Sequence, residues 1–131
     1  QIGIRSFGSA HQSDLEDAQS WGANIHHART IHEKGMQPVI DALPAGGNFF
    51  VTLDVDGLDP SIMPGTIALS PGGLSWWDID RLFTGLTNKG NVVGLNLVEL
   101  APKNDMNQIS MIGAGRLILK LLMLQLSKAS I

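Results

Sequence analysis

Two aspartates separated by one residue follow an apolar segment in the middle of the chain. Asp54 and Asp56 come directly after residues 49–53, a run of apolar and β-branched residues without polar alternation. Such a run predicts a strand that is buried on both faces of a parallel sheet. Side chains two positions apart on a strand point to the same face, about 6.6 Å apart along it. Because two such carboxylates repel each other without a proton or a cation, the pair predicts a site for a hard divalent ion at the carboxyl end of the strand.

The same pair has a simpler interpretation as the opening of a turn. Gly57 and Pro60 follow it, and both residues are common in turns. An Asp-x-Asp-Gly sequence taken alone favours this interpretation over metal binding. A calcium loop of the EF-hand type is not expected, because the third acidic position of that pattern is missing and a strand precedes the pair. The choice between turn and metal site therefore depends on the surrounding sequence.

The surrounding sequence contains two longer motifs. Residues 53–64 read LDVDGLDPSIMP and residues 92–102 read VVGLNLVELAP. Both closely resemble the ureohydrolases, the family of arginase and agmatinase, and the likeness extends over nearly the whole chain. The resemblance implies that Asp54 bridges two manganese ions, that Asp56 binds one of them, and that Glu99 holds the substrate's guanidinium through two parallel hydrogen bonds. It also implies a metal-bound hydroxide as nucleophile, so that no side chain is expected to be catalytic.

The implied function is part of a manganese-dependent amidinohydrolase that hydrolyses a small, agmatine-like guanidino compound to urea and an amine. Asn96 stands where relatives commonly carry Asp, and residues 65–69 read GTIAL where many relatives have a Gly-Thr-Pro sequence whose hydroxyl supports the Glu. These departures, with Trp76 and Trp77 in the next segment, favour the broad agmatinase-like branch over arginase itself. Asp59, in the same motif as the pair, is expected to brace the loop by accepting hydrogen bonds from backbone amides.

The family's ligating histidines belong to a Gly-Gly-Asp-His segment and an Asp-x-His-x-Asp segment, and neither occurs in this sequence. The four histidines present match no ligand spacing and favour a surface or packing role; they are His11, His26, His27 and His32. With two of about six ligands, the isolated chain is expected to hold metal poorly and to be inactive. The alternative is a non-catalytic binding or scaffold domain that retains the ureohydrolase fold.

The elements that must position these residues alternate between strand and helix. Short strands are predicted at residues 1–5 and around Ile25, and helices at residues 13–21 and 30–43. Gly35 and Pro38 weaken the second helix, whose start could instead lie near Pro38, and Thr30 with Glu33 forms a candidate capping box. A helix that begins at Ser75, with Asp78 three residues on, leads to a second buried strand at residues 92–98.

This strand, helix and strand form the crossover unit that builds parallel sheets. The sequence therefore predicts an α/β fold. Its likeness to the ureohydrolases implies a three-layer α/β/α architecture with a mostly parallel sheet, present as the C-terminal portion of a single catalytic domain over residues 1–131. The first residue is Gln1 and not Met, so we expect a piece of a longer protein.

The amino-acid composition bears on which partners and environments are expected for this chain. The chain is 44% hydrophobic and 16% charged, with a net charge of -3 and no basic run, so no nucleic-acid surface is expected. The absence of Cys excludes disulfides and thiol nucleophiles. The apolar helix predicted at residues 108–128 contains Arg116 and Lys120, which favours a core or subunit contact over a membrane span. We expect a homo-oligomer in the cytoplasm.

Overall fold

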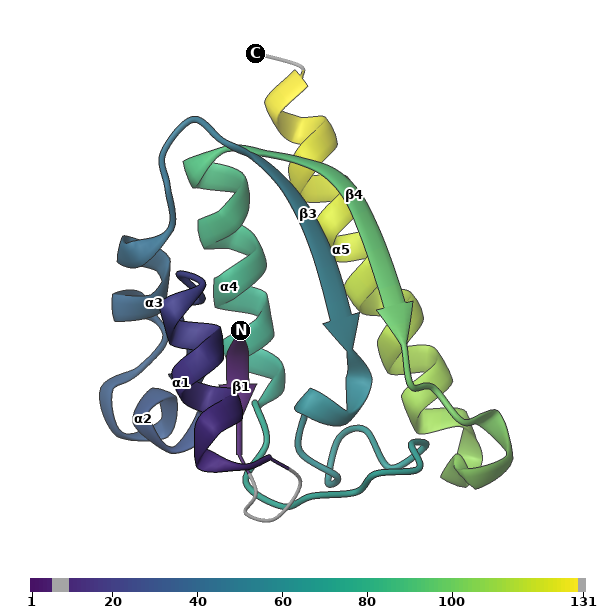
Figure 1. The fold of residues 1–131 in the computed structure, drawn as a ribbon. Coiled ribbons are helices and arrows are strands. Elements are labelled where there is room, and N and C mark those ends of the chain that lie inside the picture. The colour runs from purple at the N-terminus through teal and green to yellow at the C-terminus, as the bar shows by residue number, and fades with distance from the viewer. Residues whose placement is uncertain (6–9, 130–131) are drawn as a thin grey trace.

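A strand, a helix and a second strand carry the candidate residues. The computed structural model describes residues 1–5 and 10–129. Strand β3 spans Asn48–Asp54, helix α4 spans Trp76–Lys89 and strand β4 spans Asn91–Val98 (Figure 1). The two strands pair in parallel, with Asp54 opposite Val98 at their carboxyl ends. The predicted crossover unit and α/β class are confirmed, and residues that follow the two strands emerge at one edge of the sheet.

Helix α4 begins at the predicted capping box. Asp78 donates its backbone N–H to Ser75 Oγ at 3.2 Å, and its carboxylate accepts the Ser75 N–H at 2.9 Å. These two bonds satisfy backbone donors that have no partner inside the helix. The buried apolar face of the helix comprises Ile79, Leu82, Phe83 and Leu86. This face packs in the same core cluster as Leu53 of β3.

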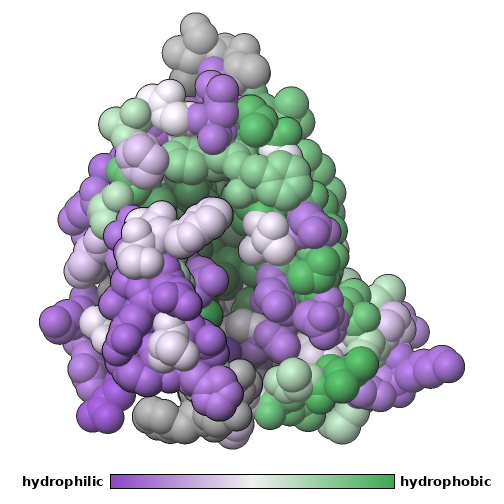
Figure 2. All heavy atoms as spheres, in the orientation of Figure 1, coloured by the Kyte–Doolittle hydropathy of each residue, from purple (hydrophilic) through white to green (hydrophobic). Residues whose placement is uncertain are grey.

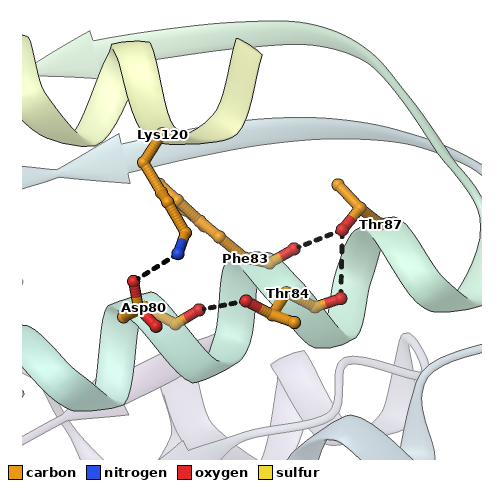
Figure 3. A network of polar contacts seen from close by, with 5 residues as sticks. All are labelled: Asp80, Phe83, Thr84, Thr87 and Lys120. Carbon is orange, nitrogen blue, oxygen red and sulfur yellow. Dashed lines mark hydrogen bonds and ion pairs between the residues drawn. The ribbon is translucent and has the colours of Figure 1, made fainter. Parts of the chain in front are cut away.

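The last helix, α5, spans Ile109–Ala129 and lies against α4 and β4 (Figure 1). Its inner face is buried at Ala114, Leu117 and Leu121. Lys120 Nζ lies 2.8 Å from Asp80 Oδ1 and links the two helices (Figure 3). By length and composition alone, the segment Met106–Lys128 could cross a membrane: its mean hydropathy is 1.6, and 22% of its apolar window is buried in this structure.

The N-terminal part forms a second, separate two-stranded sheet. Strand β1 (Ile2–Ile4) pairs in parallel with β2 (His26–His27). Three helices accompany it: α1 (Gln12–Ser20), α2 (Ala28–Lys34) and α3 (Gln37–Ala42). The predicted strands and the first helix are confirmed.

The single helix expected at residues 30–43 is wrong, because Gly35 adopts φ 78° and separates α2 from α3. The expected capping box at Thr30 and Glu33 is also wrong, since α2 begins at Ala28 and places Thr30 inside the helix. Tertiary packing of Ala28 and Ile31, both buried, decides where this helix starts.

One face of β3 and β4 is uncovered. The side chains of Phe50 and Val93 are 69% and 64% exposed, whereas Leu53 on the opposite face is 7% exposed. The prediction that β3 is buried on both faces is therefore wrong for the described residues. Leu53 belongs to the same core cluster as buried residues of α4 and α5, so these helices cover its side of the sheet and leave the Phe50 side exposed among the described residues.

Candidate metal and substrate site

The two aspartates lie on different pieces of backbone. Strand β3 ends at Asp54, and the chain continues as a 3₁₀ turn over Val55–Gly57 that contains Asp56. Val55 is fully buried and anchors the turn, whereas Asp54 is exposed and Asp56 is half-buried. The spacing expected for a regular strand is therefore wrong. The turn instead places the Asp54 carboxyl near enough to Asp56 to raise the pKa of Asp56.

Several charges act on Asp56. Burial raises the pKa of the Asp56 carboxyl above its ordinary value, and the neighbouring Asp54 and the charge of Glu99 act in the same direction, while Arg5 opposes them. Mutual repulsion of this kind is relieved when a proton or a cation binds. The three acidic side chains thus share one electrostatic neighbourhood, as the sequence predicts for the two strand ends.

A hollow of about 620 Å³ separates β1 from β3. Asp54 and Asp56 line it from the β3 side and Arg5 from the β1 side, and its apolar lining includes Leu82 and Phe83 of α4. Figure 2 shows this hollow in the middle of the molecule, with hydrophobic surface inside and above it and mostly hydrophilic surface to its left. The prediction that both aspartates face a cleft is confirmed.

Glu99 follows β4 directly and is exposed. Its φ of 64° lies in the left-handed region, which costs a residue with a Cβ about 1 kcal/mol. The end of β4, which Glu99 follows, lies beside the end of β3. The prediction that Glu99 and the aspartates emerge at the same edge of the sheet is therefore confirmed. A strained backbone at a candidate site is the kind of observation from which a functional role is inferred. Its role in binding substrate stays a prediction.

Asp59 braces the loop after the turn. Its Oδ1 accepts the N–H and the hydroxyl of Ser61 at 3.0 and 2.6 Å, and its Oδ2 accepts the N–H groups of Gly72 and Gly73 at 2.9 and 3.3 Å. The Ser61 hydroxyl and these backbone donors lower the pKa of Asp59 to about 2. The predicted bracing role is confirmed. His32 supports the same loop, since its Nε2 lies 2.9 Å from the Gly73 carbonyl oxygen.

Thr66 carries a buried hydroxyl with no hydrogen-bond partner among the described residues. The backbone on either side of it is fastened to the segment after Glu99. Ala101 donates its N–H to the Gly65 carbonyl at 2.7 Å, and Asn104 Nδ2 donates to the Thr66 carbonyl at 3.2 Å. Buried hydroxyls are normally paired, so the Thr66 hydroxyl is free to bond a side chain or a ligand.

Sequence reasoning missed Arg5. Its guanidinium Nη2 donates to the carbonyl oxygens of Asp56 and Ser70 at 2.6 and 2.7 Å, and so joins β1 to the turn after β3. Both acceptors are more than fifty residues away in sequence. The only local signal was an arginine directly after a short apolar strand. That position does not identify the carbonyl groups to which the arginine donates.

The carboxylate ligands present in this chain fit part of a divalent metal site. Asp54 and Asp56 offer hard carboxylate oxygens of the kind that manganese accepts. Within residues 1–5 and 10–129, however, no group of three or more His, Asp or Glu side chains is close enough to hold an ion. The pair can therefore supply two of the ligands of a larger site.

Comparisons with known proteins agree with this description. The family model described as "Arginase family" matches residues 1–124. The agmatinase of Chromobacterium violaceum is 30% identical over 131 residues, which cover 98% of this chain and 38% of that protein. The N(1)-aminopropylagmatine ureohydrolase of Thermus thermophilus is 35% identical over 106 residues, or 80% of this chain and 35% of that protein.

Solved structures show the same likeness. Formimidoylglutamase from Bacillus subtilis superposes with a TM-score of 0.80 at 31% identity, over 95% of this chain and 40% of that one. A hypothetical agmatinase from Burkholderia thailandensis gives a TM-score of 0.80 at 31% identity, over 98% and 39%. The chain thus spans about 40% or less of the length of these relatives.

Proposed function

Because the chain belongs to the arginase family, we propose that it supplies the Asp54–Asp56 pair and Glu99 to a manganese-dependent amidinohydrolase. The reaction is hydrolysis of an agmatine-like guanidino compound to urea and an amine. One observation carries the proposal: Asp54 and Asp56 line one hollow at the end of β3, and Glu99 follows the neighbouring parallel strand at the same edge of the sheet. The remaining ligands would come from polypeptide outside these residues.

In this proposal Asp54 and Asp56 are oxygen ligands to manganese. The chemistry that manganese would supply is the activation of water for attack on the guanidinium carbon. A cation would compete with the proton of Asp56, whose pKa is raised, so we expect metal affinity to rise with pH.

Glu99 orients the substrate. A carboxylate accepts two parallel N–H bonds from a guanidinium, which fixes the plane of the group to be attacked. The unpaired Thr66 hydroxyl lies on a loop tied to the segment after Glu99 and donates to the Glu99 carboxylate once the site is complete. The neighbouring side chains of Ile67 and Leu69 are 77% and 54% exposed and suit the methylene chain of a guanidino amine.

The test is urea release with added manganese, measured for this chain and for the longer protein of which we propose it is the C-terminal portion. We expect the longer protein to retain two manganese ions and release urea, and this chain to do neither, because two carboxylates leave an ion largely hydrated. Metal-dependent urea release by the chain alone, abolished by Asp54→Ala, would show that the count of missing ligands is wrong.

A non-catalytic binding or scaffold domain is the alternative. Asn96, which removes the charge of the Asp that relatives commonly carry, and the altered loop at residues 65–69 favour it. Calorimetry on the longer protein separates the two. Binding of a guanidino compound without urea release, at saturating manganese, would support the scaffold. We also propose a cytoplasmic location and self-association.

A further inference from the structure

We propose that Arg5 is a positioning residue for the Asp54–Asp56 pair. Its guanidinium holds the turn after β3 in the conformation that presents both carboxylates to one cation. The inference deepens the proposed function and rests on it, because the cation is the one proposed for that site.

The contacts of Arg5 join three segments. Nη2 donates to the Asp56 carbonyl at 2.6 Å and to the Ser70 carbonyl at 2.7 Å, Nε donates to the same Ser70 oxygen at 3.1 Å, and Nη1 donates to the Gly57 carbonyl at 3.3 Å. Two longer bonds of 3.5 Å reach the carbonyl oxygens of Gly3 and Leu58. Strand β1, the aspartate turn and the loop before α4 therefore meet at one side chain.

The shortest of these bonds acts on the geometry of Asp56 itself. The carbonyl oxygen of Asp56 belongs to the peptide plane that follows its Cα, so holding that oxygen fixes ψ and the direction of the Asp56 side chain relative to Asp54. The turn's own backbone bond, from the Leu58 N–H to the Val55 carbonyl, is 3.2 Å long. A hydrogen bond from a charged donor is about twice as strong as a neutral one, so Arg5 contributes more to this conformation than the turn does.

Arg5 binds the backbone of the turn and does not form an ion pair with the described aspartate side chains. Within the described residues, each of its side-chain hydrogen bonds ends on a backbone carbonyl oxygen, which leaves the carboxylate oxygens of Asp54 and Asp56 available to a cation. A positive charge beside the pair would by itself repel a divalent ion and weaken its binding. Charge and positioning thus have opposite effects on metal affinity, and removal of Arg5 reveals which is larger.

The experiment measures manganese affinity of the 131-residue chain. Amide NMR signals of residues 54–57 are followed as Mn²⁺ is added, since the paramagnetic ion broadens signals of nearby groups. The variants are Arg5→Met, Arg5→Lys and, as a matched control, Arg29→Met, which removes an exposed arginine from α2. Circular dichroism confirms that each variant is folded at the temperature used.

We expect Arg5→Met to weaken manganese binding about tenfold although it removes a repelling charge, the size typical for residues that orient metal ligands. Arg5→Lys should weaken it similarly, because an ammonium group cannot match the fork of donors. Arg29→Met should leave affinity unchanged. Equal or tighter binding by Arg5→Met, or full recovery by Arg5→Lys, would overturn the inference.

Three further outcomes are informative. If Arg5→Met does not fold, Arg5→Lys decides the question alone, since it keeps the charge and most of the side chain. If the unaltered chain shows no broadening at residues 54–57, the turn does not present the pair to a cation and the inference is overturned, whereas the proposed function is still decided by urea release from the longer protein. Equal affinities in the unaltered chain and both Arg5 variants overturn the positioning role and leave the proposed function standing.

Discussion

At the scale of single residues, Asp59 shows how one carboxylate organises a loop of the site. It accepts four hydrogen bonds, two from Ser61 and one each from Gly72 and Gly73. The loop that follows the aspartate turn is thereby tied to the segment before α4. This bracing needs an ionised side chain, because a protonated or amide group presents a donor where Oδ2 now accepts two N–H groups.

Asp59→Asn should lower the free energy of unfolding at pH 7 by about 1–2 kcal/mol, because an amide nitrogen would face the two glycine N–H groups. The pKa of Asp59 is about 2 in the folded chain and about 3.9 when unfolded. The carboxylate's contribution is therefore complete above the unfolded pKa and declines as the pH falls through that range toward the folded pKa. Urea unfolding should show the difference between the two proteins shrinking from pH 5 to pH 3. Asp17→Asn on α1 is the control, and an equal loss there would point to a general charge effect.

Glu99 allows its backbone strain and its carboxylate to be tested separately. Glu99→Ala and Glu99→Gly both remove the carboxylate, but only glycine relieves the cost of φ 64°. We expect Glu99→Gly to be more stable than Glu99→Ala by about 1 kcal/mol in urea unfolding, while neither variant supports urea release in the longer protein. Equal stabilities would show that the left-handed backbone carries no strain.

At the scale of elements, the site depends on how closely the loop before α4 approaches the loop after β3. Leu58 and Leu74 form a parallel bridge, and Asp59 and Leu74 share a backbone hydrogen bond of 3.0 Å. A Cβ added to Gly73 would lie 2.4 Å from the Leu58 carbonyl carbon and 2.5 Å from the Asp59 nitrogen. Backbone atoms cannot yield as a flexible side chain can, so this contact requires glycine.

Gly73→Ala should lower the free energy of unfolding by about 3 kcal/mol, because the two loops must separate to admit the methyl group. Gly115→Ala in α5 is the matched control. Its added Cβ meets no atom within 4 Å, and alanine favours a helix, so we expect a gain of about 0.5–1 kcal/mol. Thermal and urea unfolding of both variants measure the difference, and a mild effect of Gly73→Ala would mean that the loops shift easily.

At the scale of the whole molecule, two apolar surfaces remain exposed. The uncovered face of β3 and β4 presents Phe50 and Val93, and the outer face of α5 presents Leu119, Leu122 and Met123, which are 60%, 53% and 69% exposed. The last three lie three and four positions apart and so form one stripe along the helix. Contiguous apolar surface of this kind commonly marks a contact with another chain.

We expect the isolated chain to self-associate through this stripe. The double variant Leu119→Glu with Met123→Glu should shift the chain toward monomer in sedimentation velocity, since two carboxylates would have to be buried in the contact. Ser127→Glu adds a charge to the same helix at an exposed polar position and should leave the association unchanged. If the double variant sediments like the unaltered chain, the contact lies elsewhere, with the uncovered sheet face as the next surface to alter.

The sequence by itself determined the features that depend on neighbours a few residues apart. The apolar runs of β3 and β4, the capping box at Ser75, and the hydrogen bond from the Ser61 N–H to Asp59 could all be predicted, because each follows from local side-chain types and spacing. The shared edge of the two strand ends followed as well, since a strand, helix and strand crossover has one preferred arrangement.

Only the tertiary structure decided the rest. The turn that carries Asp56, the left-handed backbone of Glu99 and the Arg5 bonds to Asp56 and Ser70 depend on segments brought together across the chain. The exposure of Phe50 likewise depends on which helices are present to cover the sheet. Such features arise from long-range packing, in which a residue's partner is set by the whole fold and not by its sequence neighbours.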